Sequence, residues 1–452
     1  MKKHSTTMLQ GPVLWGVITY TIPIILTGVL QLLFNAADLV IVGRFCGSIS
    51  VAAVGATGSI TNLIVNLFIG LSVGAGVTVA HALGSREDDA VHRAVHAALP
   101  VALVSGVILT VVGVVFSGTF LRLMGTPDTV LPLSRVYMQI YFGGITFNMV
   151  YNFCASILRA AGDTKSPLIY LTFAGVVNVV LNVIFVTVFH MNVAGVALAT
   201  TISQGISAIL VVIALMRRTD ACRLYLRKMR FYKQELSKMV RIGLPAGIQS
   251  SLFSISNVLI QSSINSFGDV FMSGNAASSN IEGFVYVAMN AFHQTAVNFI
   301  GQNVGAHQFD RVKRTMWCCL GCVGVVGLAM GILGCAFGSQ LLSIYITDSA
   351  EAISHGMLRL SFVCLPYFLC GLMDVSTGAL RGMGASLEPM LISILGVCAF
   401  RVGWITTIFQ IPAFHTPQCL YLSYPISWIL TFCAQFLVFR KVYRRNVQML
   451  AK

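Results

Sequence analysis

The chain alternates between long runs without charged residues and short polar segments that carry most of its Lys and Arg. Residues 166–216, 315–347 and 402–439 contain no Lys, Arg, Asp or Glu. Because one membrane-spanning helix needs about 20 apolar residues, the first and last of these runs hold two spans each. The pattern predicts an all-α integral membrane protein with twelve transmembrane helices, which start near Val13, Val51, Ala94, Val130, Leu168, Val193, Val240, Asn275, Val312, Ile353, Pro389 and Gln418.

The composition supports this fold class. Only 10% of the 452 residues are charged, 56% are hydrophobic, and the mean hydropathy is +0.82. Soluble domains carry about 25% charged residues, so this chain could not cover a water-exposed surface. The composition therefore argues against a soluble enzyme, a nucleic-acid binder and a disordered scaffold.

The net charge of +14 is explained by its placement along the chain. Of the 29 Lys and Arg residues, 24 lie in the termini and in alternate loops. The positive-inside rule then predicts a multi-pass protein of the plasma (inner) membrane with both termini in the cytoplasm. The basic stretch 217–241 is interpreted as a topology signal that contacts anionic membrane lipids, with no nucleic acid as partner.

The sequence resembles itself at an offset of 221 to 222 residues. Residues 158–167 match 380–389, residues 80–84 match 301–305, and Pro23 matches Pro245. Six helices per half is an even number, so both halves enter the membrane from the same side. This predicts two parallel-repeat six-helix lobes around a central cavity, a plan that secondary transporters use. The predicted domains are 1–216, a basic cytoplasmic linker at 217–239, and 240–452 with its short basic tail.

Motifs for enzymatic chemistry are absent. There is no phosphate-binding loop motif, and the glycines of 70–76 and the cysteines of 318–322 lie in apolar runs, where helix packing explains them. The sequence therefore predicts no cofactor beyond a coupling ion, and no enzyme. An intramembrane enzyme stays a remote alternative, because His81, His190, His293 and His415 are scattered over different predicted helices.

Polar residues inside predicted spans are the candidates for function. In the first half, Gln31, Asn35 and Asp38 share one helix face, as Asn178 and Asn182 do. Pro23 can bend the first helix, and Pro245 is its counterpart as a hinge. The second half offers Glu282, Asp374 and Arg401, of which Arg401 is predicted to pair with a carboxylate. Residues predicted to line a substrate cavity are Gln31, Asn62, Asn66, Tyr137, Tyr141, Asn148, Asn257, Gln261, Glu282, Tyr286, Met289, His293, Asp374 and Arg401.

Several of these segments together resemble the multidrug and toxic compound extrusion (MATE) transporters over nearly the full length. They are Pro23 with Gln31, residues 38–44, residues 52–55, residues 302–306 and the two Leu-Arg-x-x-Gly segments at 158–162 and 380–384. The resemblance implies two six-helix lobes and outward export of cationic or amphipathic compounds, driven by inward proton or sodium flow.

The resemblance also implies a cation-coupling site formed by Asp38, Asn178, Asn182 and Thr200, with Asn35 nearby. This sequence departs from the family pattern at Asn182, where many relatives have an acid. A single carboxylate makes sodium at this site doubtful and favours a proton. In the second half, the acids that some relatives carry in helices 7 and 10 have no counterpart, and Cys370 stands at the helix 10 position.

The expected function is secondary antiport of small organic cations or amphipathic drugs by a protein predicted to be a monomer. One alternative is a flippase for lipid-linked oligosaccharides from a related branch. Such a carrier should have more basic residues in its cavity to bind phosphates, and here only Arg401 is predicted to lie deep in a span.

Overall fold

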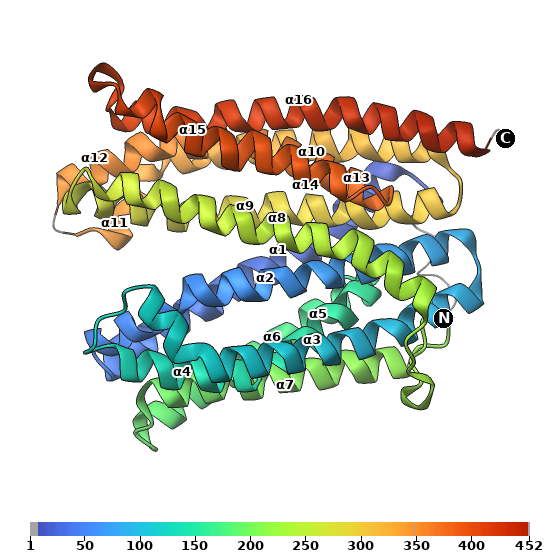
Figure 1. The fold of residues 1–452 in the computed structure, drawn as a ribbon, viewed down its shortest axis with the longest axis horizontal. Coiled ribbons are helices and arrows are strands. Elements are labelled where there is room, and N and C mark those ends of the chain that lie inside the picture. The colour runs from blue at the N-terminus through green and yellow to red at the C-terminus, as the bar shows by residue number, and fades with distance from the viewer. Residues whose placement is uncertain (1–7, 348, 451–452) are drawn as a thin grey trace. The chain divides into compact units, whose positions relative to one another are not determined.

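The computed structural model describes residues 8–347 and 349–450, and all regular elements of this part are helical. Nine helical stretches among these residues are long and apolar enough to cross a membrane, which confirms an all-α, multi-pass membrane protein (Figure 1). The α-helices are α1 (Val13–Phe45), α2 (Ser48–Ser85), α3 (Asp88–Leu123), α4 (Leu131–Gly143), α5 (Ile145–Ala160), α6 (Lys165–Thr187), α7 (Asn192–Met216), α8 (Lys233–Asn265), α9 (Asp269–Gly305), α10 (Phe309–Ala336), α11 (Gly338–Tyr345), α12 (Ala350–Arg359), α13 (Tyr367–Gly382), α14 (Leu387–Ser393), α15 (Phe400–Thr406) and α16 (Pro417–Leu450).

Shorter segments complete the helical runs. Two π-helical segments, η2 (Leu360–Cys364) and η3 (Ile394–Ala399), lie between α12 and α13 and between α14 and α15. The 3-10 segments are η1 (Leu226–Lys228), η4 (Ile408–Gln410) and η5 (Pro412–Phe414). The π-helical turns interrupt two of the predicted spans, which apolar periodicity alone does not reveal.

The three predicted spans outside the nine lie in α8, in α9 and in the pair α4–α5. The apolar stretches of α8 and α9 are diluted by Ser, Asn and Gln. Helices α4 and α5 are separated at Gly144, where a Cβ atom would lie 2.2 Å from Thr201 Cγ2 of α7. Helix α8 begins at Lys233 rather than near Val240. Its first two turns are polar, so the apolar pattern placed the start of the helix too late.

The chain forms two compact units. Among the described residues, the N-terminal unit comprises 26–251, and the C-terminal unit comprises 8–25, 252–347 and 349–450. Helices α1 and α8 each contribute to both units, since the divisions fall at Leu26 and Ser251 inside them. The basic segment at 217–239 belongs to the N-terminal unit.

The internal repeat is visible in the backbone of each unit. Gly162 and Gly384 follow α5 and α13 with left-handed φ angles of 90° and 82°. The N–H of each glycine donates to the carbonyl three residues back, at 2.9 and 2.8 Å. Gly47 and Gly268 precede α2 and α9 with φ angles of 88° and 93°. These conformations favour glycine, so matching positions of the two halves carry the same turns.

Helices α2 and α8 meet inside the N-terminal unit through glycines 70, 74, 243 and 247. A Cβ atom on Gly70 would lie 2.2 Å from Gly247 N, and one on Gly74 would lie 2.1 Å from Met239 O. The two backbones are therefore in direct contact, as at other interfaces with small residues four positions apart.

We expect Gly74→Ala to destabilise the protein, because its new methyl group forces α2 and α8 apart. Overpacking of this kind costs about 1–3 kcal/mol. Thermal unfolding of the purified protein in detergent measures the effect. Gly58→Ala in the same helix is the matched control, since a Cβ atom there meets nothing within 4 Å. Equal unfolding midpoints for the two variants would contradict the contact.

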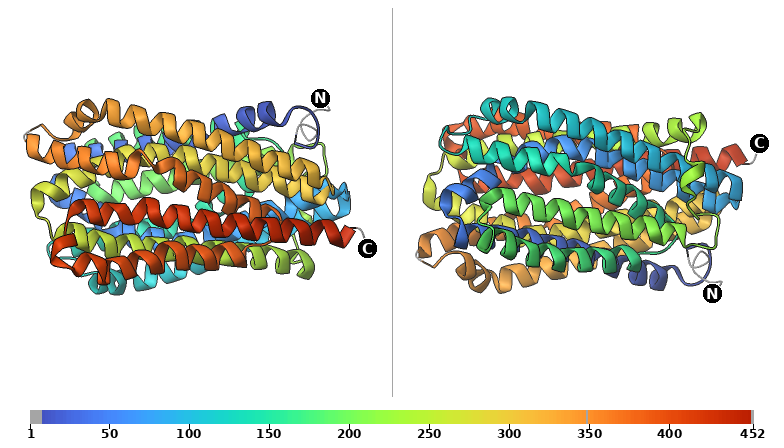
Figure 2. Two further views of the ribbon diagram at one scale, coloured as in Figure 1. Left: turned by 90° about the horizontal axis from the view of Figure 1, so that it is seen from above. Right: turned by 90° about the horizontal axis from the view of Figure 1, so that it is seen from below.

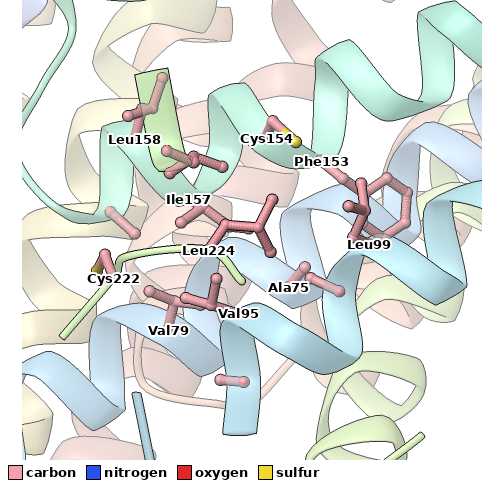
Figure 3. Packing of buried hydrophobic residues seen from close by; sticks show 14 of the residues in the cluster. Ala75, Val79, Val95, Leu99, Phe153, Cys154, Ile157, Leu158, Cys222 and Leu224 are labelled. Atoms are coloured by element: carbon pink, nitrogen blue, oxygen red, sulfur yellow. The ribbon is translucent and has the colours of Figure 1, made fainter. Parts of the chain in front are cut away.

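The basic segment after α7 packs against α3 (Figure 3). Cys222 and Leu224 are 0% and 2% exposed and join a hydrophobic cluster with Val95 of α3. The backbone N–H of Tyr225 donates to His96 Nε2 at 2.9 Å. Burial raises the pKa of the Cys222 thiol to about 12, so this thiol stays protonated at neutral pH. Part of the predicted linker is therefore a buried component of the N-terminal unit.

Candidate functional site

The carboxylate of Asp38 contacts side chains from two other helices of the N-terminal unit. Asp38 lies two turns before the end of α1 and is half-buried. The Asn182 Nδ2 of α6 donates a short hydrogen bond to Asp38 Oδ1. The Thr200 side chain of α7 also hydrogen-bonds to the carboxylate. The groups that hold this carboxylate are thus neutral.

Asn178 and Asn182 connect the site across α6 and α7. Asn182 Nδ2 also donates to Asn178 Oδ1 at 3.1 Å, and Asn178 Nδ2 donates to Thr200 Oγ1 at 3.3 Å. The Oδ1 atom of Asn182 is buried and has no hydrogen-bond partner in the described structure. The site therefore combines one carboxylate with amide and hydroxyl oxygens. These ligand types suit a small hard cation, and the carboxylate suits a proton.

The structure brings together Asp38, Asn178, Asn182 and Thr200 of the predicted coupling residues. Tyr137 lies within electrostatic range of Asp38 and stacks on Tyr141, with ring centroids 6.3 Å apart. Asn35 and Gln31 are exposed, and within the described chain neither makes a side-chain hydrogen bond to this cluster. Among the described residues, no group of three or more His, Cys, Asp or Glu side chains could hold a metal ion.

In the C-terminal unit, Glu282 of α9 forms a buried ion pair with Arg359 at the end of α12. Arg359 Nε and Nη2 donate to the two carboxylate oxygens, each at 2.8 Å. Arg359 Nη1 donates to Asn275 Oδ1 at 2.7 Å, and the Tyr421 hydroxyl donates to the same oxygen at 3.0 Å. Both carboxylate oxygens of Glu282 are therefore engaged by Arg359.

Arg401 of α15 was predicted to pair with a carboxylate, and this expectation is wrong for the described structure. Its Nε donates to Ser427 Oγ at 3.0 Å, and its guanidinium lies 4.2 Å from the Tyr424 ring centroid and 5.6 Å from that of Trp428. The Nη2 atom is buried without an acceptor. Stacking contributes about 2 kcal/mol when desolvated, less than the several kcal/mol that burying an ion costs.

Asp374 of α13 lies near His293 of α9. His293 Nδ1 is 2.7 Å from the backbone carbonyl oxygen of Asp374, and Arg381 Nη1 is 3.3 Å from His293 Nε2. His293 thus donates from Nδ1 and accepts at Nε2, which is the pattern of a neutral imidazole. The Asp374 carboxylate interacts electrostatically with the Arg381 guanidinium.

The other predicted cavity residues have varied environments. Met289 is 0% exposed inside a hydrophobic cluster, whereas Tyr286 is 45% exposed. Asn66 and Asn148 are half-buried, and Asn62, Asn257 and Gln261 are exposed. Pro23 and Pro245 lie inside α1 and α8, as expected for candidate hinges.

A cavity of about 760 Å³ lies at the C-terminal end of α16, the long red helix in Figure 2. Four of its nine lining residues are basic, and none of the nine is a predicted site residue. The lining residues are Glu388, Leu437, Val438, Arg440, Lys441, Val442, Arg444, Arg445 and Gln448.

Comparison with protein families gives two matching stretches, one in each half of the sequence. A family model described as MatE matches residues 23–184 and 245–404, which is more than half of the chain. The chain belongs to the MatE family. As a member of this family, the protein is a multi-pass membrane transporter. The family resemblance inferred from the sequence is thereby confirmed.

The chain is similar to curated members of the family. It is 28% identical to the "Probable multidrug resistance protein YpnP" of Bacillus subtilis (strain 168), with 97% of both chains covered. It is 20% identical to the "Multidrug export protein MepA" of Staphylococcus aureus (strain MRSA252), with 88% of both chains covered.

Solved structures share the fold. A crystal structure of MATE in the bent conformation matches with a TM-score of 0.91 at 19% identity, covering 100% of both chains. An outward-facing MATE family transporter of the MOP superfamily matches with a TM-score of 0.90 at 20% identity, covering 99% of this chain and 100% of that one. At this identity, the likeness supports the fold alone.

Proposed function

We propose that this MatE transporter is a secondary antiporter that exports cationic or amphipathic organic compounds. The observation that carries the proposal is the half-buried Asp38 carboxylate, held by neutral donors from α6 and α7. A carboxylate in such a position attracts an organic cation when it is charged and does not when it is protonated. The names of the relatives, multidrug resistance and multidrug export proteins, support the substrate class.

A proton is the proposed coupling ion. Asp38 is the single carboxylate of its cluster, because position 182 is an Asn whose amide donates to it. Sodium is the second candidate, favoured by the buried Asn182 Oδ1 atom that has no partner. In either case, the ion and the substrate compete for one carboxylate, so entry of the ion on one side releases the substrate there.

The proposal also covers the membrane location, the oligomeric state and the partners of the protein. The basic residues of the termini and alternate loops favour the plasma (inner) membrane with both termini in the cytoplasm. We propose that the transporter is a monomer. Its partners are small organic compounds and membrane lipids, and it binds no nucleic acid. A phosphate-bearing substrate of a flippase is less well supported. Three arginines of the described C-terminal unit are buried, namely Arg359, Arg381 and Arg401. Glu282 neutralises the first, and Asp374 acts on the second.

Proteoliposomes loaded with ethidium, a fluorescent organic cation, test the function. We expect ethidium transport when a proton gradient is imposed at equal sodium concentrations. A sodium gradient at fixed pH should have little effect. Transport under a sodium gradient alone would establish the second candidate ion. Movement that no ion gradient accelerates would contradict antiport.

A further inference from the structure

Two arginines and one carboxylate share a buried region of the C-terminal unit. Arg359 and Arg401 are 7% and 4% exposed, and Glu282 is 5% exposed. Both guanidinium groups lie over the ring of Tyr424, at 5.6 and 4.2 Å from its centroid. With one carboxylate for two guanidinium groups, this arginine pair carries one uncompensated positive charge.

The uncompensated charge belongs to Arg401. All three guanidinium nitrogens of Arg359 have acceptors, in Glu282 and Asn275. In Arg401, Nε donates to Ser427, while the buried Nη2 has no acceptor in the part of the chain that the structure describes. The terminal edge of this guanidinium, which is the edge that binds carboxylates through two parallel hydrogen bonds, thus keeps a buried donor that no described residue satisfies.

Groups from three elements face Arg401, and none of them is a carboxylate. Asp374 of α13 interacts electrostatically with Arg381 instead. The groups in electrostatic range of Arg401 are phenols and thiols, which are uncharged at neutral pH in ordinary peptides. They are Tyr367, Cys370, Cys398 and Tyr424.

The backbone is irregular beside both arginines. Arg359 immediately precedes the π-helical segment Leu360–Cys364, and Arg401 follows the π-helical segment Ile394–Ala399 by two residues. Short π-helical turns inside α-helices occur frequently at functional sites. The irregular turns and the unpaired guanidinium edge are independent observations that point to the same region.

We infer that Arg401 is a binding site for the carboxylate group of a transported compound. The inference deepens the proposed export function and rests on it. The Nη1–Nη2 edge provides a two-nitrogen fork for the carboxylate. The rings of Tyr424 and Trp428 lie at the guanidinium face and hold the fork in place. The substrate class thereby extends from organic cations to amphipathic compounds that carry an acid group.

The test compares two probes that differ in one group. The purified full-length protein is titrated with 1-pyrenebutyrate and with the uncharged 1-pyrenebutanol, and binding is read from energy transfer from Trp residues to pyrene. Trp428 beneath the guanidinium is one donor. We expect the wild type to prefer the acid by about tenfold or more, the effect of a charge-assisted hydrogen bond. Arg401→Gln should abolish the preference, and Arg401→Lys should retain part of it.

Arg122→Gln, at an exposed position of α3, is the matched control and should keep the full preference. Equal binding of both probes by the wild type would overturn the inference without any variant. An acid preference that survives in Arg401→Gln would overturn it as well, as would an acid preference that excess chloride abolishes. Gradient-driven ethidium export is measured in parallel, so failure of the carboxylate site is distinguished from failure of the export function.

Discussion

The Asp38→Asn protein is expected to insert and fold like the wild type but to lose uphill export. Asn has nearly the same shape as Asp, and its carbonyl oxygen can accept the amide hydrogen bond of Asn182. It cannot gain or lose a proton, so the site can no longer alternate between a charged and a neutral form. Ethidium efflux under a proton gradient should fall to the level of protein-free liposomes, while weak ethidium binding can persist.

Asp220→Asn is the control for removing one carboxylate from the same unit. Asp220 lies in the basic segment after α7 and pairs with Arg218, with its Oδ1 2.9 Å from Arg218 Nε. A partly exposed pair contributes about 0–1 kcal/mol, so this variant should transport like the wild type. Gradient-coupled efflux at the wild-type rate by Asp38→Asn would contradict the role of Asp38.

The site in the N-terminal unit could be predicted because part of it is local and the family resemblance supplied the rest. Asn178 and Asn182 are one turn apart on α6, and two amides on a Val-rich helix need polar partners. Helix periodicity therefore indicated a polar face, and the family resemblance supplied Asp38 and Thr200 as its partners. The structure brings these four side chains together. Asn35 is different, because a shared helix face does not ensure contact with another helix.

The polar region of the C-terminal unit could not be predicted in the same way. Glu282 and Arg359 are 77 positions apart in the sequence. Periodicity places each side chain on a helix face but does not determine which arginine neutralises the carboxylate. Arg359 was not among the predicted site residues, and Arg401 was expected to pair with a carboxylate. The one available signal was that Arg359 lies six residues after the predicted start of a span near Ile353.

The boundaries of the two units could not be predicted from the sequence pattern either. Charge density marked 217–239 as a linker, yet Cys222 and Leu224 are buried in the core of the N-terminal unit. Ala221, Met229 and Tyr232 of the same segment also pack against this core. Scattered apolar residues in a basic loop do not by themselves predict such docking. Likewise, the contact of α2 with α8 depends on glycines 173 positions apart at Gly70 and Gly243.

Glu282→Gln should strongly destabilise the protein, because it leaves the guanidinium of Arg359 buried without a counter-charge. Arg359 is 7% exposed and cannot reach water without disrupting the packing of α12 against α9. Removing one member of a buried ion pair typically costs about 3–5 kcal/mol. The thermal unfolding midpoint in detergent should fall well below that of Asp38→Asn, although both variants replace a carboxylate by its amide.

Replacing both partners distinguishes the destabilisation caused by one buried, unpaired charge from the stability that the ion pair itself contributes. In Glu282→Leu/Arg359→Met, neither charge of this pair remains, and the Asn275 oxygen still accepts the hydrogen bond from Tyr421. Substituting a buried pair by apolar residues is often neutral or stabilising, so the double variant should regain most of the stability that Glu282→Gln loses. A double variant as unstable as Glu282→Gln would show that the pair itself holds α9 and α12 together. Recovery of stability with undiminished ethidium efflux would assign Glu282 to structure and leave Asp38 as the coupling carboxylate.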